Sequence, residues 1–306
     1  MNQKSLHTVR KFKVAGHLFS VRADEGDRIW EQMQESYSPF GTDEVGEERF
    51  CLTIVSSLPR MDGELVYSNA GEAEEGFPDI ALYKGEDGLL FEITQPGSDK
   101  MNARLLVMRK DSLHAFLLLD GREIDRWFSF TSAMNICYIM STSAYSTELM
   151  HASSVIYKGW AYIFLGKSGT GKSTHSRMWK KALGDVVLMN DDHPVLRVEE
   201  DGTVRAYGSP WSGKTPCYKN ISAPLGGIIR ISRAPYNKAT SQSPLQAYAS
   251  LRSSCSLLNW SDDLAEGRHA CLESIVAKVP SYEMECLPDE DAGRVCCEAV
   301  QRKEII

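Results

Sequence analysis

Phe164-Leu-Gly-Lys-Ser-Gly-Thr-Gly-Lys-Ser-Thr-His-Ser176 is the stretch on which the interpretation of the chain depends. It contains the pattern G-x-x-x-x-G-K-[ST], which forms the phosphate-binding P-loop in nucleotide-binding proteins. Glycines suit such a loop because successive backbone N–H groups turn inward only at φ values that a Cβ opposes. A strand-like apolar run, 160–165, precedes the motif, and a helix-compatible run, 174–183, follows it. The helix N-terminus would therefore face a bound phosphate.

The residues of this loop predict a site for nucleotide phosphates. Lys172 is expected to supply a mobile cation to the β- and γ-phosphates, and Ser173 a hydroxyl for Mg²⁺. A glycine-rich turn without a ligand is the alternative interpretation. The predicted nucleotide-binding set is Gly166, Lys167, Ser168, Gly169, Thr170, Gly171, Lys172, Ser173 and Thr174.

The residues before the motif predict an antiparallel hairpin that brings a histidine to the loop. A two-residue turn at Lys158 and Gly159 would fix the register of the two strands. Counting back from that turn, His151 falls opposite Gly166. His151 is therefore a candidate catalytic residue or metal ligand, and a purely structural histidine is the alternative.

Two adjacent carboxylates follow the next apolar run. Residues 185–189 are typical of a short buried parallel strand, which ends in Asn190-Asp191-Asp192-His193. Open α/β sheets bind ligands beyond the carboxyl ends of their strands, and paired charges there are costly without a cation. Asp191 and Asp192 are therefore expected to share the binding of Mg²⁺ or Mn²⁺ and the role of catalytic base. The sequence does not say which aspartate does which, and a surface turn is the alternative.

A loop rich in turn residues, 208–215, contributes one further candidate, Lys214, as a second cation for a transferred phosphoryl group. An ordinary loop fits this segment equally well. The segments after it carry no assigned chemistry and are expected to complete a core. They are a strand at 228–231, helices at 244–254, 262–278 and 288–302, and a strand at 282–286.

The first part of the chain predicts a β-rich α+β domain. Short strand patterns run from residue 9 to about 120, with one amphipathic helix at 26–37, and none of them has catalytic spacing. A largely apolar helix at 126–145 is expected to open the second domain. The predicted domains are therefore an N-terminal recognition domain, 1–122, and a nucleotide domain, 123–306.

Composition excludes several classes of partner. The net charge of −7 over 306 residues, with no basic stripe, argues against nucleic-acid binding. No apolar run approaches the length of a membrane span, and the N-terminus lacks an apolar signal core. The eight cysteines form no C-x-x-C pair, so a reducing cytoplasm is the expected setting. The oligomeric state is not indicated.

Residues 151–214 resemble the nucleotide core shared by ATP-dependent phosphoenolpyruvate carboxykinase and HPr kinase/phosphorylase. Met150-His151-Ala-Ser-Ser154 resembles the carboxykinase strand that carries a metal-ligand histidine, 164–172 resembles its P-loop, and Asn190-Asp191-Asp192 its second kinase motif. Downstream, 210–214, 220–228 and 279–282 are similar to the uncharacterised HPr-kinase-related branch. The resemblance covers roughly the last half of the chain.

This resemblance implies an α/β fold with a P-loop mixed-sheet nucleotide core, and the activity of an ATP-dependent kinase. ATP and Mg²⁺ or Mn²⁺ would be the cofactors, and the acceptor a hydroxyl, most plausibly a serine of a protein, peptide or small molecule. An apolar helix replaces the oxaloacetate-binding segments of the carboxykinases, so decarboxylation is not expected. Phosphorolysis is not expected either, because the Glu-Ile-Arg-Gly run of HPr kinase is missing. A nucleotide-binding regulatory or scaffold protein and a mechanical ATPase are the alternatives.

Overall fold

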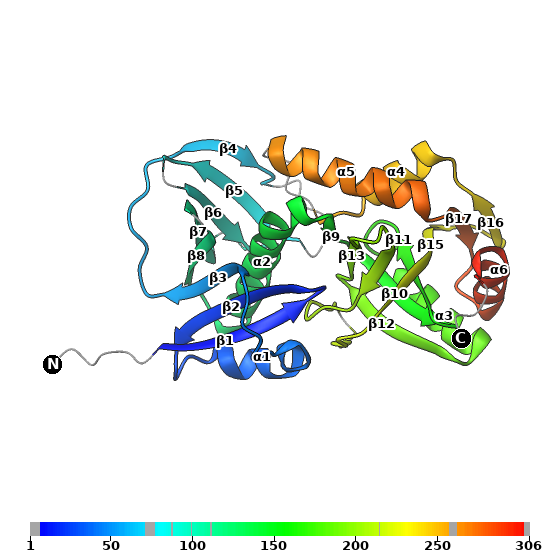
Figure 1. Ribbon diagram of the computed structural model, residues 1–306, viewed down its shortest axis with the longest axis horizontal. Helices are drawn as coiled ribbons and strands as arrows, with labels where there is room; N and C mark the ends of the chain where they lie inside the picture. The colour runs from blue at the N-terminus through cyan, green and yellow to red at the C-terminus, as the bar shows by residue number, and fades with distance from the viewer. Residues whose placement is uncertain are drawn as a thin grey trace. The chain divides into compact units, whose positions relative to one another are not determined.

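The computed structural model describes residues 7–70, 77–86, 88–98, 100–110, 112–213, 215–256 and 262–302. The chain divides into two compact units, Met1–Thr142 and Ser143–Ile306. Each unit combines helices with one large mixed sheet, so the fold is of the mixed α/β kind (Figure 1). Among the described residues, no helix is both long and apolar enough to span a membrane.

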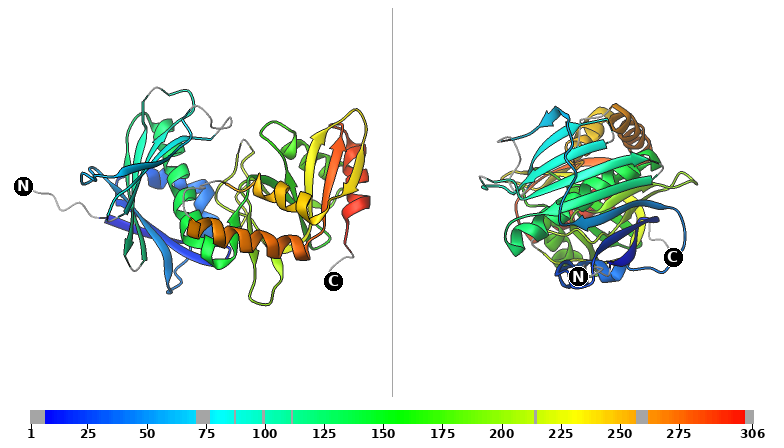
Figure 2. Two further views of the ribbon diagram at one scale, coloured as in Figure 1. Left: turned by 90° about the horizontal axis from the view of Figure 1, so that it is seen from above. Right: turned by 90° about the vertical axis from the view of Figure 1, so that its left-hand side faces the viewer.

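The first unit is built on an eight-stranded sheet with the order β1-β2-β3-β8-β7-β6-β5-β4. The right-hand view of Figure 2 looks onto these strands. The strand-rich pattern predicted between residues 9 and 120 is present, and so is the helix predicted at 26–37, which begins at Ile29. The elements are β1 (His7–Val14), β2 (His17–Asp24), α1 (Ile29–Tyr37), η1 (Ser38–Phe40), β3 (Glu48–Val55), β4 (Glu64–Ser68), β5 (Asp79–Lys84), β6 (Gly88–Thr94), β7 (Ala103–Lys110), β8 (Ser112–Leu119) and α2 (Glu123–Thr142).

Helix α2 belongs to this first unit, which corrects the predicted boundary at residue 122. It lies against β3, β6, β7 and β8 (Figure 1), and most of its apolar side chains are buried. Phe130 and Tyr138 are fully buried there, and the Tyr138 hydroxyl donates to the Val14 carbonyl at 3.2 Å. The sequence shows that this helix is apolar, but not which sheet receives it. The unit boundary therefore falls after Thr142.

The second unit is built on a nine-stranded sheet in which β12-β10-β11-β15-β14-β13-β9 follow one another and β17 joins β15 and β16. Strands β11 and β15 are parallel, whereas β10 is antiparallel to both of its neighbours. The elements are η2 (Ser143–Tyr145), β9 (Thr147–Leu149), β10 (Ala152–Tyr157), β11 (Trp160–Leu165), α3 (Lys172–Leu183), β12 (Val186–Asp192), β13 (Val195–Val198), β14 (Val204–Tyr207), β15 (Ser222–Arg233), β16 (Lys238–Ser241), α4 (Pro244–Arg252), α5 (Asp262–Lys278), β17 (Ser281–Cys286) and α6 (Glu290–Val300).

Helices cover both faces of this second sheet. On one face, Leu251 of α4 and Leu272 of α5 pack into a core cluster with Ile163 of β11. On the other face, Trp179 of α3 and Cys296 of α6 pack into a second cluster. The sheet is thus the middle of three layers, and the ends of its strands are where polar groups can meet.

Strand β12 differs from the buried parallel strand that the apolar run 185–189 predicts. It is the edge strand of the sheet and pairs antiparallel with β10, while running in the same direction as β11. The Val187 side chain is 45% exposed, because one side of an edge strand has no neighbouring strand. The strand also extends through Asp192, so the two aspartates are its last residues rather than part of a following loop.

Candidate functional site at the carboxyl edge of the second sheet

The carboxyl ends of β11, β12 and β15 lie at one edge of the second sheet, because these three strands run in the same direction. The glycine-rich loop, defined here as residues 166–173, leaves β11 at this edge and enters α3. His151 directly precedes β10, which starts at the same edge because it is antiparallel to β11. Groups far apart in sequence are thereby brought together.

Three glycines give the glycine-rich loop its shape. Gly166, Gly169 and Gly171 have φ values of 149°, 74° and 110°, which side chains with a Cβ rarely adopt. A Cβ on Gly166 would also lie 2.7 Å from the Thr170 hydroxyl oxygen. The N-cap of α3 is Gly171, which offers no side chain to its first N–H groups. The first N–H groups of a helix have no partner within the helix, so a helix that begins at a glycine can bind an anion there.

Lys172 lies under the loop with its ammonium group turned toward the loop backbone. Its Nζ donates to the Gly166 carbonyl at 2.9 Å and to the Lys167 carbonyl at 3.4 Å, and the residue is only 9% exposed. Arg233, at the end of β15, donates to the Gly169 carbonyl. The loop is therefore bounded by two cations, one buried and one exposed.

The predicted hairpin and its register are present. Tyr157 pairs with Trp160 around a turn in which Lys158 and Gly159 have φ values of 49° and 80°. Both values are positive, as a two-residue hairpin turn of type I′ requires. The pairs run in this register to Ser153 and Phe164. The chain departs from the ladder at His151, whose N–H donates to the Ser254 carbonyl at 2.6 Å.

His151, Asp192 and His193 form a cluster at this edge. The Asp192 carboxylate lies between the two imidazoles, with Oδ1 3.6 Å from His151 Nε2 and Oδ2 3.0 Å from His193 Nδ1. The two rings are nearly parallel, 6.1 Å apart between centroids. The structure thus brings together His151 and Asp192, as predicted, and adds His193, which the sequence analysis did not select.

Charge in this cluster favours a neutral imidazole beside an ionised carboxylate. Burial, together with the nearby Lys172 ammonium, lowers the pKa of His151 to about 4 although Asp192 opposes the shift. Burial would raise the pKa of Asp192, but His193, His151 and Lys172 outweigh it and the pKa is lowered. At neutral pH, His151 is therefore uncharged and Asp192 carries a negative charge.

Asp191 and Asp192 point to opposite faces of the sheet. Asp191 pairs with Ser153, whose hydroxyl meets that of Ser176 on α3 at 2.6 Å. Asp192 pairs with Ala152, which packs into the core cluster of α4 and α5. Since paired residues share a face, Asp191 lies on the α3 side and Asp192 on the other.

Ser173 lies on the same side of the sheet as Asp191. It precedes Ser176 by three residues on α3, and residues at this spacing share a helix face. The Ser173 hydroxyl is thus one turn nearer the glycine-rich loop than the contact between Ser153 and Ser176. Asp191 is 6% exposed. Burial raises the pKa of the nearby Cys217 thiol, and the charge of Asp191 adds a smaller effect in the same direction.

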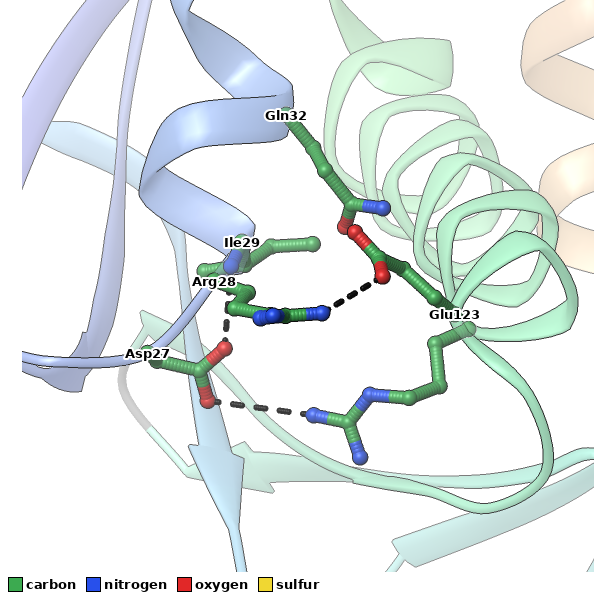
Figure 3. A pocket seen from close by; sticks show the side chains of 6 residues that line it. Asp27, Arg28, Ile29, Gln32 and Glu123 are labelled. Atoms are coloured by element: carbon green, nitrogen blue, oxygen red, sulfur yellow. Dashed lines mark hydrogen bonds and ion pairs between the residues drawn. The ribbon is translucent and has the colours of Figure 1, made fainter.

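No three His, Cys, Asp or Glu side chains of the described residues are grouped so as to hold a metal ion by themselves. Lys214, the predicted second cation, lies outside the described residues. A polar pocket of about 420 Å³ occurs in the first unit, between the starts of α1 and α2 (Figure 3). Two ion pairs, Arg28 with Glu123 and Arg126 with Asp27, neutralise its charges. It is lined by Asp27, Arg28, Ile29, Gln32, Glu123 and Arg126.

Comparison with known proteins finds no protein-family model and no curated protein that matches this sequence. His193 is the residue that sequence reasoning missed, although it was part of the quoted run 190–193. The available signal was its position directly after the two aspartates at the end of a strand.

Proposed function

We propose that this chain is an ATP-dependent kinase that transfers the γ-phosphoryl group of ATP to a hydroxyl. One observation carries the proposal: the glycine-rich loop, a buried lysine and two aspartates on opposite faces meet at one edge of one sheet. The resemblance of residues 151–214 to the nucleotide core of phosphoenolpyruvate carboxykinase and HPr kinase agrees with it. On this proposal the second unit is a P-loop core of that type.

The side chains at this edge fit a magnesium ion that is held jointly with a nucleotide. Mg²⁺ usually keeps several waters and takes one or two carboxylates together with substrate phosphates, so a complete protein cage is not needed. Ser173 and Asp191, which share the α3 side of the sheet, are the residues that would hold it, directly or through water. When bound, the ion neutralises charge on the phosphates.

The remaining groups divide the work of transfer. The Lys172 ammonium would leave the loop carbonyls for the β- and γ-phosphates, where the contact becomes charge-assisted. Asp192 would accept the proton of the acceptor hydroxyl. As it does so, the hydroxyl oxygen bonds to the γ-phosphorus, and the bond from that phosphorus to the bridging β–γ oxygen breaks, which releases ADP. Neutral His151 would orient the acceptor. Positioning and charge neutralisation carry most of such catalysis.

Phosphoryl transfer from γ-labelled ATP to serine-bearing proteins, peptides and small molecules tests the proposal. The wild type should label an acceptor in a Mg²⁺-dependent reaction, and Lys172→Ala should not. Lys181→Ala is a matched control, because Lys181 is exposed near the far end of the same helix. Mg²⁺-dependent ATP binding without turnover would favour a regulatory nucleotide-binding protein, and wild-type activity in Lys172→Ala would place the site elsewhere.

A further inference from the structure

We propose that His193 is a positioning residue that holds the Asp192 carboxylate in the orientation needed to accept a proton. The inference rests on the proposed function, because it assigns a role within the same site. It starts from the unequal contacts of the two carboxylate oxygens. Oδ2 lies within hydrogen-bond distance of His193 Nδ1, at 3.0 Å, whereas Oδ1 is 3.6 Å from His151 Nε2.

The contact with His193 selects which oxygen of Asp192 is available to a ligand. A carboxylate rotates about the Cβ–Cγ bond and would otherwise exchange its two oxygens. With Oδ2 accepting from His193 Nδ1, Oδ1 is directed toward His151 and keeps capacity for a further donor. Reacting groups need to be held within about 0.5 Å and 10–20° of the productive geometry. His193 provides such a restraint on the Asp192 carboxylate without contacting the acceptor hydroxyl itself.

His193 is itself held in place by the buried residues around it. Its backbone N–H donates to Asn190 Oδ1 at 2.8 Å, and its carbonyl accepts from the Ser209 hydroxyl at 2.6 Å. Asn190 is fully buried, and its amide nitrogen donates to the Ser209 and Trp211 carbonyls at 3.3 and 3.0 Å. These hydrogen bonds fix the backbone of His193, so its ring is carried on a backbone that is held beside Asp192, and breaking them would be costly.

The restraint is specific to one ring nitrogen. The Nδ1 atom must carry the proton in order to donate to Asp192, so the neutral ring must be the Nδ1–H tautomer. An asparagine places its amide nitrogen where Nδ1 lies, while a glutamine places it nearer the position of Nε2. The two substitutions are therefore a matched pair, because both side chains end in a carboxamide and the glutamine is longer by one methylene group.

The kinetics of phosphoryl transfer distinguish a positioning role of His193 from a role in packing alone. His193→Ala should lower kcat roughly 10- to 100-fold, the usual loss for a misplaced reacting group, with KM for Mg²⁺-ATP changed less than about twofold. His193→Asn should recover most of the loss and His193→Gln little of it. Wild-type kcat in His193→Ala, or equal kcat in the Asn and Gln variants, would overturn the proposal. His269→Ala, an exposed histidine of α5, is the control.

Nitrogen NMR tests the contact without any turnover, so that failure of the proposed function and failure of this inference can be told apart. With ¹⁵N-labelled imidazoles, the His193 ring of the wild type should be the Nδ1–H tautomer. In Asp192→Ala it should change toward the Nε2–H form. A wild-type His193 in the Nε2–H form, or a ring unaffected by Asp192→Ala, would contradict the inference even if kinase activity were demonstrated. Absence of transfer in a wild type with the Nδ1–H tautomer would refute the kinase role instead.

Discussion

The interior of the first unit and the carboxyl edge of the second sheet bury different kinds of side chain. In the first unit, aromatic residues form the interior: Phe19 stacks on Phe50 with centroids 4.8 Å apart, and Tyr37 packs on Phe130. At the carboxyl edge of the second sheet, Lys172, Asp191 and several hydroxyl and amide groups are buried instead. Apolar burial stabilises a fold, whereas polar burial costs free energy unless partners compensate it. On the proposed function, this polar edge of the second sheet is where phosphoryl transfer takes place.

Substitution of the paired aspartates should have the largest effect, and it acts only on the second unit. Asp192→Asn removes the proton acceptor while preserving size, so phosphoryl transfer should fall by roughly 10²- to 10⁴-fold with Mg²⁺-ATP binding retained. Asp191→Asn should instead weaken binding of Mg²⁺-ATP and spare binding of metal-free ATP. Calorimetry and single-turnover assays measure both effects. If both variants bind Mg²⁺-ATP and transfer phosphoryl groups like the wild type, Asp191 and Asp192 do not have the roles assigned to them.

Truncation of a core aromatic in the first unit should give the opposite result. Phe130→Ala removes a fully buried ring between α2 and its sheet, which should lower the free energy of unfolding by about 3–5 kcal/mol. Affinity for Mg²⁺-ATP, measured well below the melting temperature, should stay within a factor of two. A large loss of affinity in the folded variant would show that the first unit contributes to the nucleotide site.

A pair of glycine substitutions sharpens the comparison. Gly166 has a φ of 149° and a neighbouring hydroxyl 2.7 Å from any added Cβ, whereas nothing lies within 4 Å of a Cβ on Gly26. Strain of about 1–3 kcal/mol in the loop should weaken Mg²⁺-ATP binding in Gly166→Ala by roughly 5- to 150-fold. Gly26→Ala should bind like the wild type. Equal affinities would mean that the loop conformation does not matter for binding.

The sequence predicts local geometry correctly where a short-range rule, such as a turn type, determines how two strands pair. The turn at Lys158 and Gly159 sets the hairpin register as far as Ser153 and Phe164, and His151 lies just beyond the last of these pairs. The packing of a helix on a sheet far away in the sequence cannot be predicted in the same way. Helix α2 is apolar around most of its surface, so its sequence does not indicate which sheet it covers. The contact of His193 with Asp192 depends on a side-chain orientation that the run 190–193 leaves open.

Stability toward acid should depend on a histidine behind the loop. His175 is 3% exposed on α3, and burial lowers its pKa from 6.5 to about 4. The unfolded chain therefore binds a proton that the folded chain does not, and stability is lost as pH falls from about 7 toward 4. Between pH 7 and pH 5 the loss from this group should be on the order of 1–2 kcal/mol. Urea unfolding of wild type and His175→Gln measures it, and equal pH dependence in the two would contradict the assignment.

The central claim is that the second unit holds the whole nucleotide phosphate site, and calorimetric titration with Mg²⁺-ATP tests it most directly. Residues 143–306, checked for folding by circular dichroism, are titrated beside the full chain, each with and without Lys172→Ala. We predict that the fragment binds within a few-fold of the full chain and that Lys172→Ala abolishes binding in both. A folded fragment that fails to bind, or a Lys172→Ala chain that binds as tightly as the wild type, would contradict the account.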